Sequence, residues 1–345
     1  MKLARVLGPP LLLAGSVLVT LTVSEGFFTL LLVRPSLLRI LPATTVSHVR
    51  HYYLAHDRNM VQAMPESARY DRELFYTLRP GTFRFRNREF DNEFRVNRLG
   101  LRDDEESLRK PAVVVLGDSY AMGWGVDQDK TLAKVIGRET GLRSLNAGIA
   151  SYGTVREMRL LDRIDAARLR YLVIQYCNDD FLENRPFANH DDAFSVADEA
   201  HYAEDVRRAE RRRRYWFGRR TFEFLKDVFT PDEHHGPRPD SPEDEALHFV
   251  NAVWKAGRTD LSRVRIIAFE ITQSRAVNSG FTLAVRKEVA SEKYPHYIRD
   301  MVVIDLVGHL TPANYYDLDD HLRESGQLAI AKAVIEAIRA EEGSS

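Results

Sequence analysis

The chain opens with a long apolar stretch and then alternates between short apolar runs and amphipathic segments. After Lys2 and Arg5, residues 6–24 carry no charge, and residues 26–33, which follow Glu25, are again uncharged. A helix over 6–24 spans roughly 28 Å, close to the ~30 Å hydrocarbon core of a bilayer. The run is longer than the apolar region of an ordinary signal peptide and is not followed by an Ala-x-Ala site, which favours an uncleaved signal anchor over a cleaved signal peptide.

We therefore expect residues 1–44 to form a membrane anchor and juxtamembrane segment, with the membrane contacted through residues 6–33. Basic residues flank the apolar stretch on both sides, so the positive-inside rule does not fix its orientation. A short N-terminus before a large domain is the usual arrangement of an exported domain. We expect a single-pass protein of the cell inner membrane, with residues 45–345 periplasmic or otherwise extracytoplasmic.

The next segment, residues 45–110, is polar and rich in aromatic residues, with little helical period. Alternating positions in Thr82–Arg86 and Phe94–Asn97 predict edge strands or a clamp over the main domain. We interpret this segment as an extended lead-in packed on a main domain at residues 111–345.

From Ala112 onward the pattern is repeatedly that of a strand followed by a helix. Apolar or β-rich runs predict strands at 112–116, 143–146, 171–176, 264–269 and 301–304. Amphipathic spacing predicts helices at 131–140, 155–167 and 326–340, the first of which ends at Gly141. Alternating elements of this kind indicate an α/β fold with a doubly wound parallel sheet.

Between the third and fourth strands, residues 184–259 form the least regular region, which we interpret as an insertion in the main domain. It contains an arginine-rich run, Arg207–Arg220, and a Pro/Gly-rich segment, Pro231–Pro239. The arginine run fits a solvated face of a helical insertion better than a site for an anionic polymer or lipid headgroups.

Composition narrows the class of function. The chain has 49 basic and 50 acidic residues, so no global charge points to a nucleic-acid partner. The one cysteine, Cys177, excludes an internal disulfide. His234 and His235 lie beside two acidic residues, but neighbours on a Pro/Gly loop have no fixed ligand geometry. We expect no metal site and no organic cofactor.

Gly117-Asp118-Ser119 directly follows the first predicted strand. This placement puts a serine hydroxyl at the carboxyl edge of the sheet, where parallel α/β sheets bind their ligands. A turn-rich passage follows, so the Ser119 N–H lies near a helix N-terminus, which favours developing negative charge. A glycine turn with a capping serine is the alternative.

The ends of two further strands supply possible hydrogen-bond donors. Gly148 follows the second strand, and Asn178 follows the third. The N–H groups of Ser119 and Gly148, with the side-chain amide of Asn178, would make a three-donor oxyanion hole. Glycine and asparagine are also common at turns, but three such positions at successive strand ends favour a site.

His321 follows the last predicted strand and precedes the last helix, which puts it on the same edge as Ser119. A neutral imidazole there can take the serine proton and later return it to the leaving group. We choose Asp319 as the carboxylate that fixes the imidazole tautomer. The alternatives are Asp317 and Asp320 for the carboxylate, and His309 for the base.

Four segments in order resemble blocks I, II, III and V of the SGNH hydrolases, the GDSL-like esterase superfamily: Val113–Ser119, Asn146–Gly148, Asn178–Asp179 and Asp319–His321. Two earlier segments are similar to the lead-in of its membrane-anchored bacterial members: Tyr70–Tyr76 and Asn97–Asp103. The resemblance implies a three-layer α/β/α, flavodoxin-like fold and the hydrolysis or transfer of ester-linked acyl groups. It also implies a nucleophile, a base and two oxyanion donors: Ser119, His321, Gly148 and Asn178.

The chain departs from the family pattern at two positions. Block V usually reads Asp-x-x-His, but Leu318 stands where the aspartate is expected, which leaves the orienting carboxylate open. Block III usually reads Gly-x-Asn-Asp, and Tyr176 stands in place of the glycine, which leaves the shape of the pocket floor open. We interpret Cys177, at the variable position, as a packing residue.

These observations favour a membrane-tethered serine esterase that acts on an acyl-ester substrate through an acyl-enzyme at Ser119. Water as acceptor makes the protein a hydrolase of carbohydrate or small acyl esters. A sugar hydroxyl as acceptor makes it an O-acyltransferase in the modification of envelope or extracellular polysaccharides, with an acylated glycan as partner. A hypothesis from a different class is a non-catalytic tethered protein that uses Arg207–Arg220 to hold an acidic glycan or lipid.

Overall fold

A computed structural model describes residues 2–229, 239–272 and 280–343. The predicted loop Pro231–Pro239, with His234 and His235, lies outside the described residues except for its last position.

In the described part of the chain, the central sheet has five parallel strands in the spatial order β6-β5-β7-β8-β9. They are β5 (Val113–Leu116), β6 (Ser144–Asn146), β7 (Tyr171–Tyr176), β8 (Arg265–Glu270) and β9 (Val302–Ile304). The second strand in chain order lies at one edge and the first lies beside it, which is the flavodoxin-like order. The prediction of an α/β fold with a doubly wound parallel sheet is confirmed.

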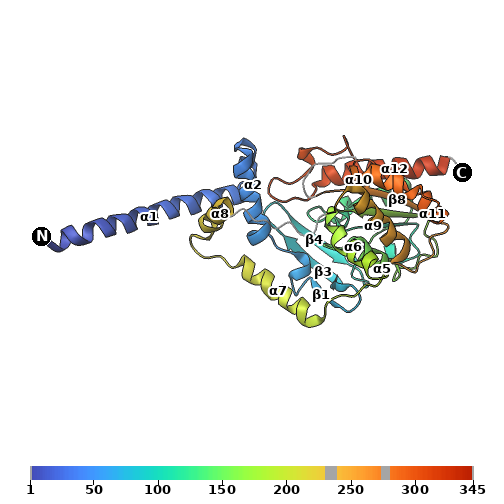
Figure 1. Cartoon of the computed structure of the whole chain (residues 1–345), viewed down its shortest axis with the longest axis horizontal. Helices are drawn as coiled ribbons and strands as arrows, with labels where there is room; N and C mark the ends of the chain where they lie inside the picture. The colour runs from blue at the N-terminus through green and yellow to red at the C-terminus, as the bar shows by residue number, and fades with distance from the viewer. Residues whose placement is uncertain (1, 230–238, 273–279, 344–345) are drawn as a thin grey trace.

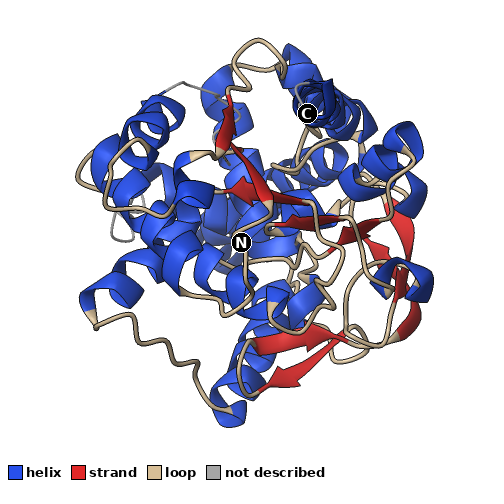
Figure 2. Cartoon of the chain, turned by 90° about the vertical axis from the view of Figure 1, so that its right-hand side faces the viewer, coloured by secondary structure: helices blue, strands red, loops and turns tan. Residues whose placement is uncertain are grey.

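Helices cover both faces of this sheet, which gives three layers (Figure 2). Because successive side chains of a strand point to opposite faces, Val113 and Val115 pack toward α4 (Leu132–Thr140) and α12 (Glu324–Gly343). Val114 and Leu116 pack in the opposite layer. The main helices of that layer are α5 (Thr154–Leu161), α9 (Pro242–Lys255) and α10 (Gly280–Val289). Coverage on both sides explains why the central strands are apolar throughout.

The lead-in contains two antiparallel hairpins that are separate from the central sheet. They are β1 (Ala68–Asp71) with β2 (Phe75–Leu78), and β3 (Gly81–Arg86) with β4 (Asp91–Val96). Of the two alternatives, edge strands or a clamp over the main domain, these hairpins are not edge strands of the central sheet. The alternation has a different cause: Phe85 and Phe94 lie in one apolar cluster with Trp124 and Tyr316, which packs the lead-in onto the main domain.

Within the described residues, the insertion between β7 and β8 is largely helical, as the prediction of a helical insertion requires. Its helices are α6 (Phe181–Asn189), α7 (Glu199–Arg213), α8 (Arg219–Phe229) and α9. At the start of α9, the Ser241 side chain accepts a hydrogen bond from the Asp244 N–H and Pro242 follows at the first turn, a common N-terminal pattern. None of the residues of α7, all of which are described, is buried, so α7 has no apolar stripe to detect.

The N-terminal helix α1 (Lys2–Val33) extends away from the rest of the molecule (Figure 1). Among the described residues, its segment Pro10–Val33 is the one helix long and apolar enough to cross a membrane. The C-terminal end of α1 is docked on the domain, because Phe28, Leu31 and Leu32 are buried in a cluster with residues of α2 (Ala43–Tyr52) and α8. The buried carboxylate of Glu25 accepts hydrogen bonds from the Thr221 N–H (2.8 Å) and Tyr215 Oη (2.8 Å).

Candidate active site

The serine lies on a tight turn at the carboxyl end of β5. Gly117 has φ +145°, and a Cβ there would lie 2.5 Å from Gln175 Oε1, so the turn requires glycine. Gln175 Oε1 accepts the N–H groups of Asp118 and Ala121, both at 3.1 Å, which fixes the turn against β7. Ser119 is then the first residue of a short helix, α3 (Ser119–Met122).

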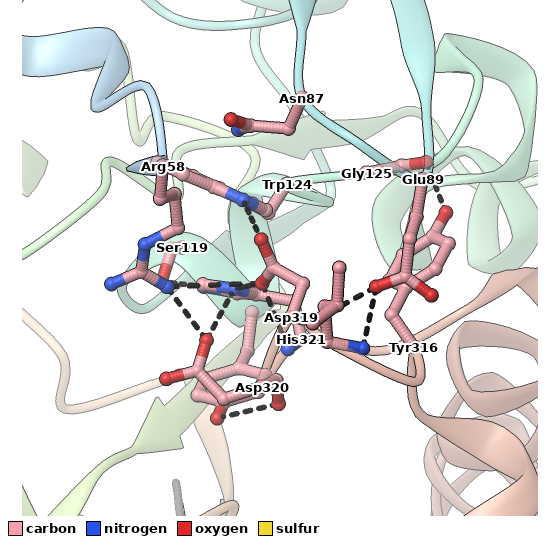
Figure 3. A network of polar contacts seen from close by, with 12 residues as sticks. Arg58, Asn87, Glu89, Ser119, Trp124, Gly125, Tyr316, Asp319, Asp320 and His321 are labelled. Atoms are coloured by element: carbon pink, nitrogen blue, oxygen red, sulfur yellow. Dashed lines mark hydrogen bonds and ion pairs between the residues drawn. The ribbon is translucent and has the colours of Figure 1, made fainter. Parts of the chain in front are cut away.

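The structure brings together three of the side chains singled out from the sequence (Figure 3). His321 Nε2 lies 2.6 Å from Ser119 Oγ, and His321 Nδ1 lies 2.5 Å from Asp319 Oδ1. The imidazole stacks on the indole of Trp124, with ring centroids 4.7 Å apart and an interplanar angle of 15°. His321 and Asp319 are both buried. The arrangement is a hydroxyl, an imidazole and a carboxylate joined by two hydrogen bonds.

The three candidate carboxylates occupy different environments. Asp319 also accepts hydrogen bonds from Tyr53 Oη (2.9 Å) and Trp124 Nε1 (3.4 Å). Asp320 Oδ1 lies 3.0 Å from His321 Nδ1 and 2.7 Å from Arg58 Nη1. The third carboxylate, that of Asp317, instead pairs with Arg39 and Arg323, each at 3.0 Å. Asp319 therefore makes the shorter contact with the imidazole, and Asp320 a second one.

The loop that carries these residues is held by a carboxylate from the lead-in. Glu89 Oε1 accepts the Asp317 N–H at 2.7 Å, and Glu89 Oε2 accepts the N–H groups of Leu318 and Asp319 at 2.8 and 2.9 Å. Figure 3 shows Glu89 beside this stretch of backbone, opposite Arg58. Three converging N–H groups fix the backbone immediately before His321.

The carboxylates determine the charge of the imidazole. Burial lowers the pKa of His321, but Asp320 and Asp319 raise it by more, and the resulting pKa is about 9. Burial also raises the pKa of Asp118, beside the serine, to about 6. The two carboxylates thus favour the protonated form of His321 in the free protein.

The two other proposed oxyanion donors are Gly148, which packs against α3, and Asn178. The Gly148 N–H donates to Asn146 Oδ1 at 3.1 Å, and a Cβ on Gly148 would lie 2.4 Å from the Met122 N atom. Asn178 is exposed and begins the turn η6 (Asn178–Asp180). Among the described residues, neither belongs to the lining of the cavity at Ser119. Their role as oxyanion donors stays a prediction.

A cavity of 230 Å³ lies beside Ser119, which we call the catalytic cavity. Its lining comes from the carboxyl ends of β5, β6 and β7 and from the lead-in. Besides Ser119 and His321, the lining includes Arg58, Met60, Trp124, Ser151, Tyr152 and Leu182. This is the edge of a doubly wound sheet at which ligands bind.

One cluster among the described residues has ligand atoms close enough together to hold a metal ion. It consists of Asp319, Asp320 and His321, whose ligand atoms all lie within 4.8 Å of one another. The Arg58 guanidinium already supplies a cation to this group, 2.7 Å from Asp320 and 3.7 Å from Asp319. The carboxylate oxygens and the imidazole nitrogen of this cluster are thus already engaged, in ion pairs with Arg58 and in the hydrogen bond to His321 Nδ1.

Three further residues discussed from the sequence lie away from the cavity. Tyr176 packs in the α9–α10 layer, stacked on Phe281 at a centroid distance of 4.2 Å, and does not line the catalytic cavity. Burial raises the pKa of the Cys177 thiol well above its ordinary value, which disfavours the nucleophilic thiolate. His309 is exposed and outside the catalytic cavity lining.

Sequence reasoning missed the residues that surround the histidine. Tyr53, Arg58 and Glu89 come from the lead-in, more than 200 positions before His321. Trp124 lies in the turn-rich passage after Ser119 but follows no motif that assigns it to the imidazole. The one sequence signal was the density of aromatic and arginine residues in the lead-in.

No family model matches the chain, and no curated protein matches it. Among solved structures, it is similar to a protein described as a "putative lipolytic protein of G-D-S-L family" from Desulfitobacterium hafniense DCB-2. That match has 11% identity and a TM-score of 0.34, and covers 65% of this chain and 97% of the other. An acetyl xylan esterase from Butyrivibrio proteoclasticus is similar at 10% identity and a TM-score of 0.34, over 67% of this chain and 64% of its own.

Proposed function

We propose that the protein is a serine ester hydrolase that acts through an acyl-enzyme. The observation that carries this proposal is the hydrogen-bonded series from Ser119 Oγ through His321 to Asp319, with contacts of 2.6 and 2.5 Å. A nucleophile, a base and an orienting carboxylate in this geometry are the requirements for serine-based acyl transfer.

The proposed reaction begins when unprotonated His321 accepts the Ser119 hydroxyl proton at Nε2 as Oγ attacks the ester carbonyl carbon. The tetrahedral intermediate then collapses, the C–O bond to the alcohol breaks, and His321 returns the proton to the leaving oxygen. Water next attacks the acyl-enzyme, giving its proton to His321, and collapse of the second intermediate restores Ser119 and releases the carboxylic acid. Asp319 holds the Nδ1–H tautomer and stabilises the imidazolium in both halves.

The negative charge on the carbonyl oxygen requires hydrogen-bond donors beside Ser119. The Ser119 N–H, at the start of α3, supports this role. The contribution of Gly148 and Asn178 is carried as a prediction, because the Gly148 N–H donates to Asn146 and Asn178 lies outside the cavity lining.

The size of the catalytic cavity supports a small acyl group. At 230 Å³ it is smaller than the ~300–1,000 Å³ usual for small-molecule sites. The same chemistry makes an O-acyltransferase if a sugar hydroxyl replaces water in the second half-reaction. Exposure of the site to water favours hydrolysis, and exclusion of water by a bound acceptor favours transfer.

We further propose that α1 anchors the protein in the inner membrane, with the catalytic domain on the extracytoplasmic side. Support comes from the apolar Pro10–Val33 segment and from α8, which is docked on Glu25 of α1. Next to α1, α8 exposes Phe222, Leu225 and Phe229 at helical spacing, and Trp216 is exposed just before it. An amphipathic helix with such a face, next to a spanning helix, fits the interface of a bilayer.

The enzymatic proposal is tested with the full chain in nonionic detergent and 4-nitrophenyl acetate as substrate. Ser119→Ala should lower kcat by at least about 10³-fold, the scale of losing a catalytic nucleophile. Ser291→Ala, which lies between α10 and α11 (His296–Arg299) and outside the lining of the catalytic cavity, is the matched control and should turn over normally. Equal hydrolysis by wild type and Ser119→Ala would remove Ser119 from the mechanism. Salt-sensitive glycan binding without turnover would favour the non-catalytic alternative.

A further inference from the structure

A second and larger cavity adjoins the catalytic cavity. It has a volume of 470 Å³ and lies between α7, the β1–β2 hairpin and the turns η2 (Tyr53–Asp57) and η3 (Val61–Ala63). Figure 1 shows α7 running beside β1 in this part of the molecule. Four residues line both cavities, which places the two side by side: Arg58, Met60, Ser151 and Arg156. A ligand whose ester bond lies at Ser119 would extend into this second cavity.

The arginine-rich run divides into two faces of α7. Arg208 and Arg212 line the second cavity together with Arg213, which follows them on the same side. Arg207 and Arg211 instead pair with Glu204, at 3.0 and 2.6 Å, and are not in the lining. Within each set the two arginines lie four positions apart, about one helical turn, and the two sets are offset by one position, about 100° around the helix axis. The run is therefore not a uniform solvated face.

The cavity has an excess of positive charge. Its lining contains five arginines and one carboxylate, Asp205. Arg58 and Arg156 are paired with Asp320 and Glu183, which lie on the catalytic side. The α7 arginines are less fully compensated: Arg208 lies 3.5 Å from Asp205, and Arg213 donates to the uncharged Asn59 side chain. Within the described part of the chain, Arg212 has no ion-pair partner.

Part of the cavity wall is aromatic. Phe75 and Tyr76 of β2 and Tyr202 of α7 form it, with the rings of Tyr76 and Tyr202 stacked at a centroid distance of 6.3 Å and an angle of 21°. At the junction with the catalytic cavity, Gln62 Nε2 donates to Ser151 Oγ at 2.9 Å. Aromatic faces pack against the C–H faces of sugar rings, hydroxyl and amide groups bond sugar hydroxyls, and arginine forks bind carboxylate or phosphate oxygens.

We propose that the second cavity binds a sugar unit bearing a carboxylate or a phosphate, and that the substrate is an acyl ester of such an anionic carbohydrate. This rests on the proposed esterase function for the place of the ester bond. Arg208 and Arg212 bind the anion, the aromatic wall holds the sugar ring, and the acyl group enters the catalytic cavity.

The test measures inhibition of 4-nitrophenyl acetate hydrolysis by the full chain in nonionic detergent. Trigalacturonate is compared with its neutral methyl ester, and glucose 6-phosphate with glucose, which separates carboxylate from phosphate recognition. We expect one charged member to inhibit at least about 10-fold more tightly than its neutral counterpart. Equal inhibition by charged and neutral members would overturn the proposal.

Matched arginine variants locate the effect. Arg208→Gln with Arg212→Gln should raise the inhibition constant of the charged sugar about 10-fold or more, because a charge-assisted hydrogen bond is lost at each position. Arg207→Gln with Arg211→Gln removes the same charge from the other face of α7 and should leave the inhibition constant unchanged. Equal weakening of inhibition by both pairs of substitutions would show that only the overall positive charge matters, which would contradict binding in the second cavity. Inhibition only by micelles doped with phosphatidylglycerol would assign the arginines to lipid instead.

Direct binding separates the two proposals. Calorimetric binding of the charged sugar to the Ser119→Ala chain should match binding to wild type, since the second cavity does not need the nucleophile. Binding without Ser119-dependent hydrolysis would leave the cavity standing and refute the esterase. Ser119-dependent hydrolysis without charge-selective binding would support the esterase and refute the binding role of the second cavity.

Discussion

Arg58 Nη1 lies 2.7 Å from Asp320 Oδ1, so the lead-in supplies the cation that neutralises the carboxylate beside His321. The two side chains are 13% and 11% exposed, which makes the pair largely inaccessible to water. Because Arg58 comes from the segment after α2, this contact joins the lead-in to the loop that carries the candidate base.

Arg58→Gln should destabilise the protein strongly, because it leaves a largely buried carboxylate unpaired. Losing one partner of such a pair costs about 3–5 kcal/mol in the free energy of unfolding. Arg86→Gln breaks an exposed pair with Asp91 and should cost less than about 1 kcal/mol. Urea unfolding of both variants measures the difference, and equal values would show that the Arg58–Asp320 pair does not hold the loop.

Asp319→Asn should lower kcat by about 10⁴-fold, because an amide at this position stabilises the wrong imidazole tautomer. Asp320→Asn should cost less than about 10-fold at pH values above 9, since Asp320 is the more distant carboxylate, at 3.0 Å against 2.5 Å. Steady-state kinetics with 4-nitrophenyl acetate compares the two. A larger loss for Asp320→Asn would transfer the orienting role to that residue.

The pH dependence of kcat/KM follows from the raised pKa of His321. A general base works in its unprotonated form, and this group has a pKa of about 9, so kcat/KM should rise with pH and level off only above about 9. Asp320→Asn removes the largest cause that raises this pKa and should move the midpoint to lower pH. Asp317→Asn, whose carboxylate pairs with Arg39 and Arg323, should leave it in place. A wild-type midpoint near 6.5 would contradict the role assigned to the carboxylates.

Trp216 should contact lipid if α8 lies at the bilayer interface. In vesicles of brominated lipids, the tryptophan fluorescence of the full chain should be quenched, and Trp216→Phe should remove most of the quenchable signal. Trp124 is buried and Trp254 packs on Tyr294, so neither should respond. Quenching that persists in Trp216→Phe would place α8 away from the bilayer.

Local signals were sufficient for the framework of the site. Ser119 was found because a glycine turn after an apolar strand is a short-range pattern, and His321 because it lies between the last strand and the last helix. The strands were found because burial on both faces makes them continuously apolar, as in β7, whose predicted bounds agree with the structure.

Contacts between distant parts of the chain could not be predicted from local sequence patterns. Arg58 and Glu89 act on the His321 loop from over 200 positions away, and no local pattern connects them. The position of Gly148 after a strand predicted an N–H donor for the site. Whether this N–H donates to Asn146 Oδ1 depends on the rotamer of the Asn146 side chain, which the sequence does not determine. The arginine run was expected on a helical insertion, but its charged pattern did not fix the bounds of α7, and only the structure shows that one face of this helix lines a cavity.

The most direct test of the central claim is labelling of the full chain with a serine-directed fluorophosphonate, followed by peptide mapping. A serine activated by His321 should carry the label at Ser119, at a rate that rises with pH and is abolished in His321→Ala but not in His309→Ala. Labelling at another serine, or undiminished labelling of Ser119 in His321→Ala, would contradict the account.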